Sequence, residues 1–251
     1  MTRFAASPTG FVHIGGVYAA TIAKAVAQHS GGSCFVRIED TDQNREVVGA
    51  EQQFARAFAY FGIESEETDE NSQCGPYRQS ARAAIYLTYA RELLRRGRAY
   101  LCFCTKQELW AAISEEQTAA KVPTGHYGKW ARWRDAPTER VMAELSVRTP
   151  YVVRFRSPEG AGRVRYQDGI RGWIEQGDNR NDVCHPENIG RGASAPDVPS
   201  AHAVDDHLMR VNKVIRGEEW ISSVPLHHQL FDALGFPRLQ YSHIAPYEDG
   251  R

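Results

Sequence analysis

Residues 7–16 read SPTGFVHIGG and place a histidine between glycines close to the start of the chain. The short, partly apolar segment TRFAA precedes them at 2–6. After them, apolar side chains recur at roughly helical spacing: Val17, Ala20, Ile22, Ala23 and Val26. The pattern predicts a strand, a loop and the beginning of a helix, and such loops form the ligand-binding edge of open α/β sheets.

This loop carries residue types that suit a phosphate. Gly10, Gly15 and Gly16 let a backbone approach phosphate oxygens closely, and a helix N-terminus offers unpaired N–H groups with a partial positive charge. His13 is placed to donate a hydrogen bond to a phosphoryl oxygen as charge builds up on it. An ordinary turn with a surface histidine is the alternative, because short glycine motifs are weak evidence.

Composition narrows the class of protein. The 251 residues suffice for one large domain or two modest ones, and 42% hydrophobic with 24% charged residues is ordinary for a globular protein. No apolar run approaches the length of a bilayer and no signal peptide is visible, so we expect a cytoplasmic protein without a membrane partner. A net charge of −1 excludes a uniformly basic nucleic-acid-binding chain, though not a local basic surface. The five cysteines are unevenly spread, which argues against a disulfide framework.

Strand and helix patterns alternate in the first part of the chain. SCFVRIED at 33–40 reads as a buried parallel strand, and helices are predicted at 47–62 and 81–97. The buried face of the first of these helices is expected to carry three aromatic residues: Phe54, Phe58 and Phe61. The order of elements indicates an α/β fold.

The pattern changes between about 100 and 188. Segments 151–160 and 163–175 alternate apolar and polar residues and predict antiparallel strands. Near residue 200 the first pattern returns, with a strand and then a helix: 212–220 and 225–236. The simplest architecture is a parallel α/β sheet split by an inserted domain.

Several segments together are far more specific than one glycine motif: RFAASPTGFVHIGG (3–16), VRIEDTD (36–42), TGHYGKWARWRDA (124–136) and VIRGEEW (214–220). In this order they resemble the glutamyl-tRNA synthetase family, from Arg3 to about His243. HIGG at 13–16 is similar to the class I signature loop usually written HIGH, with glycine in its last position.

The resemblance implies a fold and a division of the chain. It implies an α/β fold with a Rossmann-like parallel sheet and an inserted α+β connective domain for the acceptor end of tRNA. The expected first half of the catalytic domain is 1–99, the insertion is 100–188, and the second half is 189–251, which stops before a KMSKS-like loop.

The resemblance also implies substrates, which are glutamate, ATP with Mg²⁺, and tRNA. Glutamate brings two carboxylates and an ammonium, and arginine gives a planar two-point contact to a carboxylate. Arg3 and Arg216 match the family positions that hold glutamate, and Ser7 and Glu39 match positions that contact it, with Glu39 facing the ammonium. The alternatives are a terminal surface charge for Arg3 and a structural cap for Glu39. When no glutamate is bound, the like charges of Arg3 and Arg216 are expected to repel each other.

The same comparison implies the ATP-binding and catalytic residues. Those for ATP binding are Ala5, Thr9, Gly10, His13 and Gly16, and those for catalysis are His13, Gly15 and Gly16. Asp205, Asp206 and His207 are expected at a strand end or a helix start, where a helix cap is the alternative to a place near the amino acid. Two histidines of the helix 225–236 are expected to be surface or packing residues: His227 and His228.

Two departures from the family pattern stand out. Some members bind zinc through Cys-x-Cys followed by Tyr-x-x-x-Cys; Cys102, Cys104 and Tyr127 fit, but Ala131 takes the last position. Loss of one thiolate from a four-ligand site predicts that zinc is not bound tightly, with His126 the only nearby substitute.

The second departure lies at 184–202, CHPENIGRGASAPDVPSAH, where the family has an apolar strand and then a segment that supplies a tyrosine. One codon choice for CHPENIGR, read one base later, gives VILKTSD, which is close to the expected strand. We hypothesise a local frameshift here, and genuine divergence of a loop is the alternative. The nucleotide sequence across the segment decides between them.

The function expected from these observations is ATP-dependent activation of glutamate and its ligation to tRNA. No segment resembles the lysine loop, so the chain is expected to be a catalytic fragment or a reduced homologue with little aminoacylation activity of its own. The alternatives are a paralogue that glutamylates the queuosine base of a tRNA, a small-molecule nucleotidyltransferase, and an inactive tRNA-binding remnant.

Overall fold

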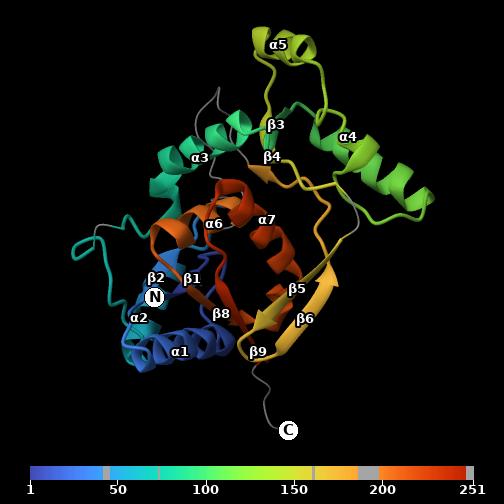
Figure 1. Ribbon diagram of the computed structural model, residues 1–251. Helices are drawn as coiled ribbons and strands as arrows, with labels where there is room; N and C mark the ends of the chain where they lie inside the picture. Colours follow the sequence, from blue (N-terminus) through green and yellow to red (C-terminus); the bar gives the residue numbers. More distant parts are fainter. Residues whose placement is uncertain (42–45, 73, 160–161, 186–197, 247–251) are drawn as a thin grey trace.

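The computed structural model describes residues 1–41, 46–72, 74–159, 162–185 and 198–246 (Figure 1). The strands are β1 (Thr2–Ala6), β2 (Cys34–Ile38), β3 (Ala99–Cys102), β4 (Val152–Phe155), β5 (Arg163–Asp168), β6 (Gly172–Gly177), β7 (Cys184–His185), β8 (Lys213–Gly217) and β9 (Gln240–Ile244). The α-helices are α1 (Ile14–His29), α2 (Ala50–Tyr60), α3 (Ala83–Arg95), α4 (Lys106–Ala111), α5 (Thr138–Ser146), α6 (Val198–Leu208) and α7 (Val224–Leu234). Most of the altered segment, 186–197, lies outside the described residues, as does the end of the acidic motif at Asp42.

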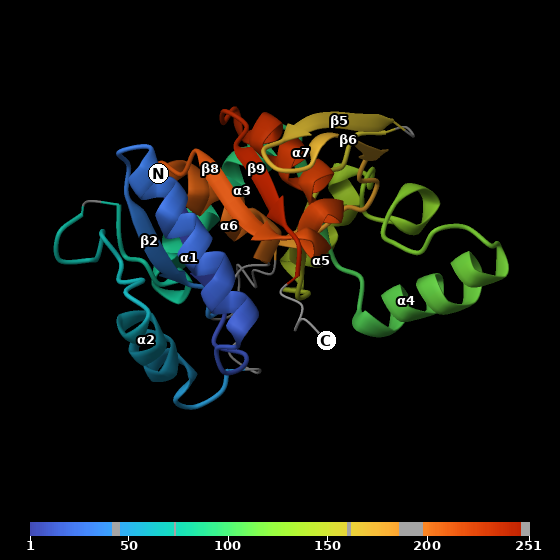
Figure 2. The same cartoon turned by 90° about the horizontal axis from the view of Figure 1, so that it is seen from below.

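The opening unit β1–α1–β2 has the predicted form. β1 and β2 are parallel, with Thr2 opposite Cys34 and Ala6 opposite Ile38. Helix α1 begins at Ile14, so Gly15 and Gly16 of the glycine–histidine loop (7–16) lie in its first turn. The helix buries a row of small or medium-sized residues: Val17, Ala20, Ala23 and Ala27. Short side chains on this face allow the helix axis to lie close to the strands (Figure 2).

Helix α2 departs from the predicted face at one residue. Phe54 and Phe58 are buried and pack beside the ring of Phe4. Phe61 is 52% exposed, so its placement on the buried face was wrong. The helix ends at Tyr60, and Gly62 at φ +65° turns the chain away before the next residue on that face.

The second parallel pair lies in a four-stranded sheet ordered β6–β5–β9–β8. β8 and β9 are parallel, and β5 and β6 form an antiparallel hairpin that joins β9 through Asp168 and Tyr241. The amides of Asn212 and Lys213 donate to the carbonyl of Met1, which brings β8 beside β1. The parallel pairs and their helices give the Rossmann-like α/β fold (Figures 1 and 2).

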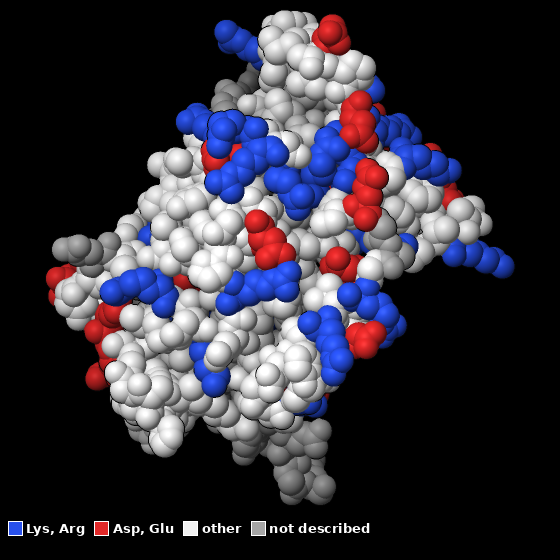
Figure 3. Space-filling view, in the orientation of Figure 1, with Lys and Arg blue, Asp and Glu red and all other residues white. Residues whose placement is uncertain are grey.

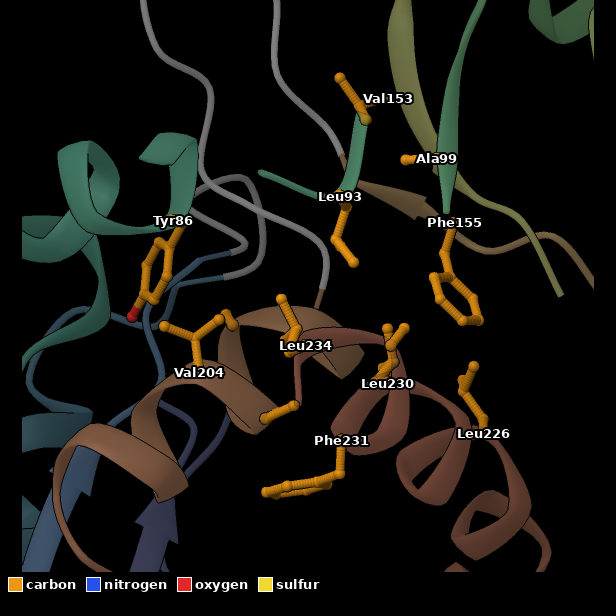
Figure 4. Packing of buried hydrophobic residues seen from close by; sticks show 13 residues of the cluster. Tyr86, Leu93, Ala99, Val153, Phe155, Val204, Leu226, Leu230, Phe231 and Leu234 are labelled. Carbon is orange, nitrogen blue, oxygen red and sulfur yellow. The ribbon is translucent and has the colours of Figure 1, made fainter. Parts of the chain in front are cut away.

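A third sheet, β3–β4–β7, is antiparallel and lies on the largest apolar cluster. In Figure 4, Tyr86 and Leu93 come from α3, Val153 and Phe155 from β4, and Leu230 with its neighbours from α7. The side chains of Leu93, Val153, Phe155, Leu230 and Phe231 are all fully buried. This cluster fixes α6 and α7, which carry polar side chains on their other faces. Among the described residues, no helix has the length and apolar character needed to cross a membrane.

Candidate functional site

The glycine–histidine loop lines a cavity at the carboxyl end of β1. The cavity measures about 290 Å³, and its walls include Ala5, Ser7, Thr9, Gly10, His13 and Gly16, together with Phe4, Val12 and Phe54. The structure thus brings together all the residues expected to bind ATP. Gly15 is not part of the wall, so its predicted role does not rest on contact with this space.

His13 occupies the N-cap of α1 with its side chain exposed. Its imidazole caps no backbone amide, while its carbonyl accepts from the amides of Gly16 and Val17 at 3.0 and 3.2 Å. The ring is therefore free of the helix that presents it. A Cβ on Gly15 would lie 3.1 Å from the ring atoms Cε1 and Nδ1, so this glycine makes room for the imidazole. Gly15 thus affects the site through His13.

Arg3 is buried and forms an ion pair with Asp206, which lies far away in the sequence. In β1 it lies opposite Phe35, and the two share one face of the β1–β2 pair with Arg37. Its Nε and Nη2 donate to the two carboxylate oxygens of Asp206 at 3.1 and 3.2 Å. Only 3% of Arg3 is exposed, so the interpretation as a terminal surface charge is wrong. Its charge is also balanced before any ligand binds.

Arg37 is the residue that links these groups. Its guanidinium is fully buried and donates to Asp206 Oδ1 and to Glu39 Oε1, each at 2.7 Å. The His202 ring lies against the same groups, with Nδ1 3.1 Å from Arg37 Nη2 and Nε2 2.6 Å from Arg3 Nη2. Burial raises the pKa of Glu39, but the charges of Arg37 and Arg3 together with the hydrogen bond to His202 outweigh it, and the pKa falls to about 2. Glu39 is therefore ionised at neutral pH.

Asp205 and Asp206 lie in the last turn of α6, so the expectation of a strand end or helix start was wrong, and so was the helix-cap alternative. Both are fully buried. Asp205 holds the neighbouring elements, since it accepts from Gln79, Arg82 and the hydroxyl of Tyr86 at 2.7–3.0 Å. Asp206 faces the strands, while His207 on the far side stacks on Phe236 with ring centroids 3.7 Å apart.

Arg216 differs from the other arginines of the site because no carboxylate of the described residues lies within ion-pair distance of it. Its Nε donates to His243 Nε2 at 3.1 Å, Nη2 donates to the carbonyl of Trp220 at 3.0 Å, and its guanidinium lies over the Tyr241 ring at 4.8 Å. Burial lowers its pKa to about 10, and the like charge of Arg3 contributes. The expected repulsion between Arg3 and Arg216 is thus present, but Arg3 is paired with Asp206, and of the two arginines only Arg216 lacks a carboxylate partner among the described residues.

His227 and His228 of α7 are each 5% exposed. They are therefore packing residues and not surface residues, which were the two expected alternatives. His227 stacks on His202 at 5.1 Å and lies 3.5 Å from Arg216 Nη1, so it packs against Arg216 and the His202 ring. Burial lowers the pKa of His228 to about 4.

The expected zinc position does not gather four ligands. Cys102 Sγ lies 3.9 Å from His126 Nε2, but the hydroxyl of Tyr127 donates to the carbonyl of Pro123, and Ala131 is buried. Within the described ranges, no three His, Cys, Asp or Glu side chains could hold a metal ion. The absence of tight zinc binding stays a prediction.

Sequence reasoning missed Arg37 and His202, and it did not recognise that Asp206 is a partner of Arg3. The signal for Arg37 was present, because a charged residue inside the apolar run CFVRI has to find a buried partner. His202 falls within the altered segment, where the family pattern could not be followed.

Parallel strands, a glycine-bearing loop at a helix N-terminus and buried arginines nearby are typical of α/β proteins that bind nucleotides. Residues 1–247 match the family model of class I tRNA synthetases (E and Q), catalytic domain, and the chain belongs to this family.

Relatives and solved structures are more specific. The chain is 43% identical to a glutamate–tRNA ligase of Sorangium cellulosum over 99% of its length, and 45% identical to one of Clostridium beijerinckii over 97%. It covers 46% and 44% of those proteins, so it spans about half the length of the curated relatives it matches. A crystal structure of glutamate–tRNA synthetase from Elizabethkingia anophelis has a TM-score of 0.88 at 35% identity, covering 97% of this chain and 49% of that one. A glutamate–tRNA ligase from Elizabethkingia meningosepticum, solved in complex with its amino acid, matches with the same score and identity, over 100% of this chain and 51% of that one.

Proposed function

We propose that this chain binds glutamate and ATP and forms glutamyl-adenylate, the first step in the ligation of glutamate to tRNA. The observation that carries the proposal is the charge balance of the pocket. Arg3 and Arg37 pair with Asp206 and Glu39. Arg216 lies near enough to Arg3 and Asp206 to feel their charges, yet within the described residues it has no carboxylate partner, so its positive charge is left over. A ligand carboxylate would complete this set, because arginine binds carboxylates through paired N–H groups.

Each part of glutamate has a counterpart in the proposed site. Arg216 binds the side-chain carboxylate, with Arg3 behind it. Glu39, whose pKa is about 2, stays anionic and faces the ammonium. Ser7 follows β1 directly, and the amide of Glu39 donates to the carbonyl of Ala6 at 2.7 Å, so both residues lie at the same edge. This edge adjoins the cavity of the glycine–histidine loop.

The chemistry follows from that neighbourhood. ATP, acting as its magnesium complex, occupies the cavity beside Thr9, Gly10 and Gly16. An oxygen of the glutamate α-carboxylate attacks the α-phosphorus, the bond to pyrophosphate breaks, and glutamyl-adenylate forms. His13, exposed and free of capping contacts, donates to phosphoryl oxygen as negative charge develops. The glutamyl group then passes to the 3′ end of tRNA with release of AMP.

A basic surface is available for tRNA. Figure 3 shows Lys and Arg side chains gathered over α3 and beside β3 and β4. Arg95 and Arg96 lie at the end of α3, with side chains 73% and 41% exposed. Phosphate contacts from such residues supply most sequence-independent affinity for nucleic acids.

Calorimetric titration with glutamate tests the proposal directly. Arg216→Gln should weaken glutamate binding about 10- to 100-fold, the effect of losing a charge-assisted contact. The matched control is Arg210→Gln, because Arg210 is 63% exposed and pairs with Glu67 away from the pocket. Glutamate- and tRNA-dependent ATP–pyrophosphate exchange then distinguishes a ligase from a remnant that only binds tRNA. Equal glutamate affinity in Arg216→Gln and the parent would refute the assignment.

A further inference from the structure

Arg216 is held by a chain of two buried residues from two other strands. His243 in β9 lies beside it, in register with it across the parallel pair. On the other side of the imidazole, Nδ1 is 2.6 Å from Oδ2 of Asp168, the last residue of β5. His243 and Asp168 have fully buried side chains. The three residues thus form a line across β5, β9 and β8.

The direction of each hydrogen bond in this line is fixed by chemistry. Arginine Nε carries a hydrogen and has no acceptor, so the Nε2 of His243 has to accept. The imidazole is therefore neutral and carries its proton on Nδ1, from which it donates to Asp168. Asp168 is held in turn by the backbone amides of Ile170, Arg171 and His243 at 3.0–3.2 Å. The carboxylate consequently decides which imidazole nitrogen faces Arg216.

The charged and titratable groups around His243 favour the neutral ring. They are Asp168 from β5, Arg216 from β8, Tyr241 on its own strand and Arg171, which contacts its carbonyl at 3.4 Å. Burial lowers the pKa of His243, and the nearby charge of Arg216 acts in the same direction against the hydrogen bond to Asp168.

The contacts of Arg216 show which of its N–H groups are left to bind a ligand. Arginine has five N–H groups. One goes to His243, one to the carbonyl of Trp220, and a third points to His227 Nδ1 at 3.5 Å. One N–H on each terminal nitrogen is then left for a ligand, which is the forked pair that a carboxylate accepts.

We propose that Asp168 and His243 are positioning residues that fix the orientation of Arg216 and so set its affinity for a carboxylate substrate. This inference rests on the proposed function for the identity of that substrate. Neither residue touches the ligand; Asp168 acts by selecting the imidazole tautomer, and His243 by offering the lone pair that holds Nε.

The decisive variant is Asp168→Asn. The amide keeps an oxygen for the backbone donors but turns an NH₂ toward His243 Nδ1. The imidazole proton then moves to Nε2 and faces the Nε–H of Arg216, donor against donor. Glutamate affinity measured by calorimetry should fall about tenfold or more. In a His243→Ala background, Asp168→Asn should have no further effect on affinity, because it acts only through the imidazole.

Asp182→Asn is the matched control for the loss of a buried carboxylate. Asp182 also accepts from a backbone amide, that of Ser157 at 2.9 Å, and from Tyr100 and Arg134, all outside the pocket. It should lower the thermal midpoint and leave glutamate affinity unchanged. An equal loss of affinity in both variants would reduce Asp168 to a structural residue and overturn the inference.

A second readout does not require glutamate to bind. Nitrogen-15 chemical shifts of His243 should report Nδ1–H in the parent and Nε2–H in Asp168→Asn. The Nε–H signal of Arg216 should be protected from solvent exchange in the parent and exchange faster in the variant. If the parent binds no glutamate, the proposed function fails, while the tautomer and the Arg216 signal still decide the positioning role. Nε2–H in the parent, or an unchanged Arg216 signal in the variant, would overturn it.

Discussion

Asp206→Asn should destabilise the whole fold, although it removes a single charge. Asp206 is fully buried and accepts from Arg3 and Arg37, whose side chains are 4% and 0% exposed. The amide can satisfy part of this geometry but cannot offset two guanidinium charges. Leaving buried charges without their partner costs about 3–5 kcal/mol of unfolding free energy. For a chain of this size, that lowers the thermal midpoint by about 6–20 °C.

The effect has a signature in pH. Burial raises the pKa of Asp206, but Arg3, His202 and Arg37 outweigh it and hold the pKa well below its usual range. A carboxylate with a depressed native pKa stabilises the fold above its unfolded pKa near 4, and this stabilisation is lost as the pH falls further. The parent should therefore lose stability below about pH 4, and the gap between the parent and Asp206→Asn should narrow there.

Urea unfolding at pH 7 and at pH 3 measures both effects. The control is Asp232→Asn, which breaks an ion pair with Arg238 whose side chains are about half exposed; such pairs contribute less than about 1 kcal/mol. A cost below about 1 kcal/mol for Asp206→Asn at pH 7, or a gap that stays constant down to pH 3, would refute the reasoning.

Three further outcomes are expected. His13→Ala should unfold like the parent yet slow adenylate formation by about 10²–10³, measured by pyrophosphate exchange, and equal rates would assign His13 to an ordinary surface role. Purified protein should contain much less than one zinc per chain by elemental analysis, and Ala131→Cys should raise the content; stoichiometric zinc in the parent would show that His126 or another group completes the site. Burial lowers the pKa of His228 to about 4, so the parent should lose stability as the pH falls from about 6.5 toward 4, by about 1.4 kcal/mol per pH unit from this residue. His228→Phe should flatten that dependence of unfolding free energy on pH. An unchanged slope in unfolding titrations of the variant would exclude His228 as its source.

The local secondary structure around His13 could be predicted from the sequence. Strand, loop and helix around His13 followed from hydrophobic spacing and glycine positions, because these depend on neighbours along the chain. The helix end at Tyr60 was one residue too early for Phe61 to be buried, since boundaries depend on turn geometry more than on periodicity.

Sequence reasoning named some residues of the candidate site but did not predict which of them pair. Arg3 and Arg216 were identified by resemblance, yet Arg3 pairs with a carboxylate 203 positions away. The sequence around a buried arginine does not predict which distant carboxylate will pair with it. For the same reason Arg37 was missed, because its burial depends on Asp206, 169 positions further on.

The hairpin β5–β6 has a practical consequence for protein engineering. It falls within 100–188, the segment expected to be an insertion, yet its strand β5 pairs with β9 through Asp168 and Tyr241. A chimera that exchanged this segment for that of a relative would therefore also replace β5 and β6, two of the four strands of the sheet that contains β8 and β9. The graft would have to keep the register between β5 and β9, so module boundaries chosen from the sequence alone would cut through the sheet.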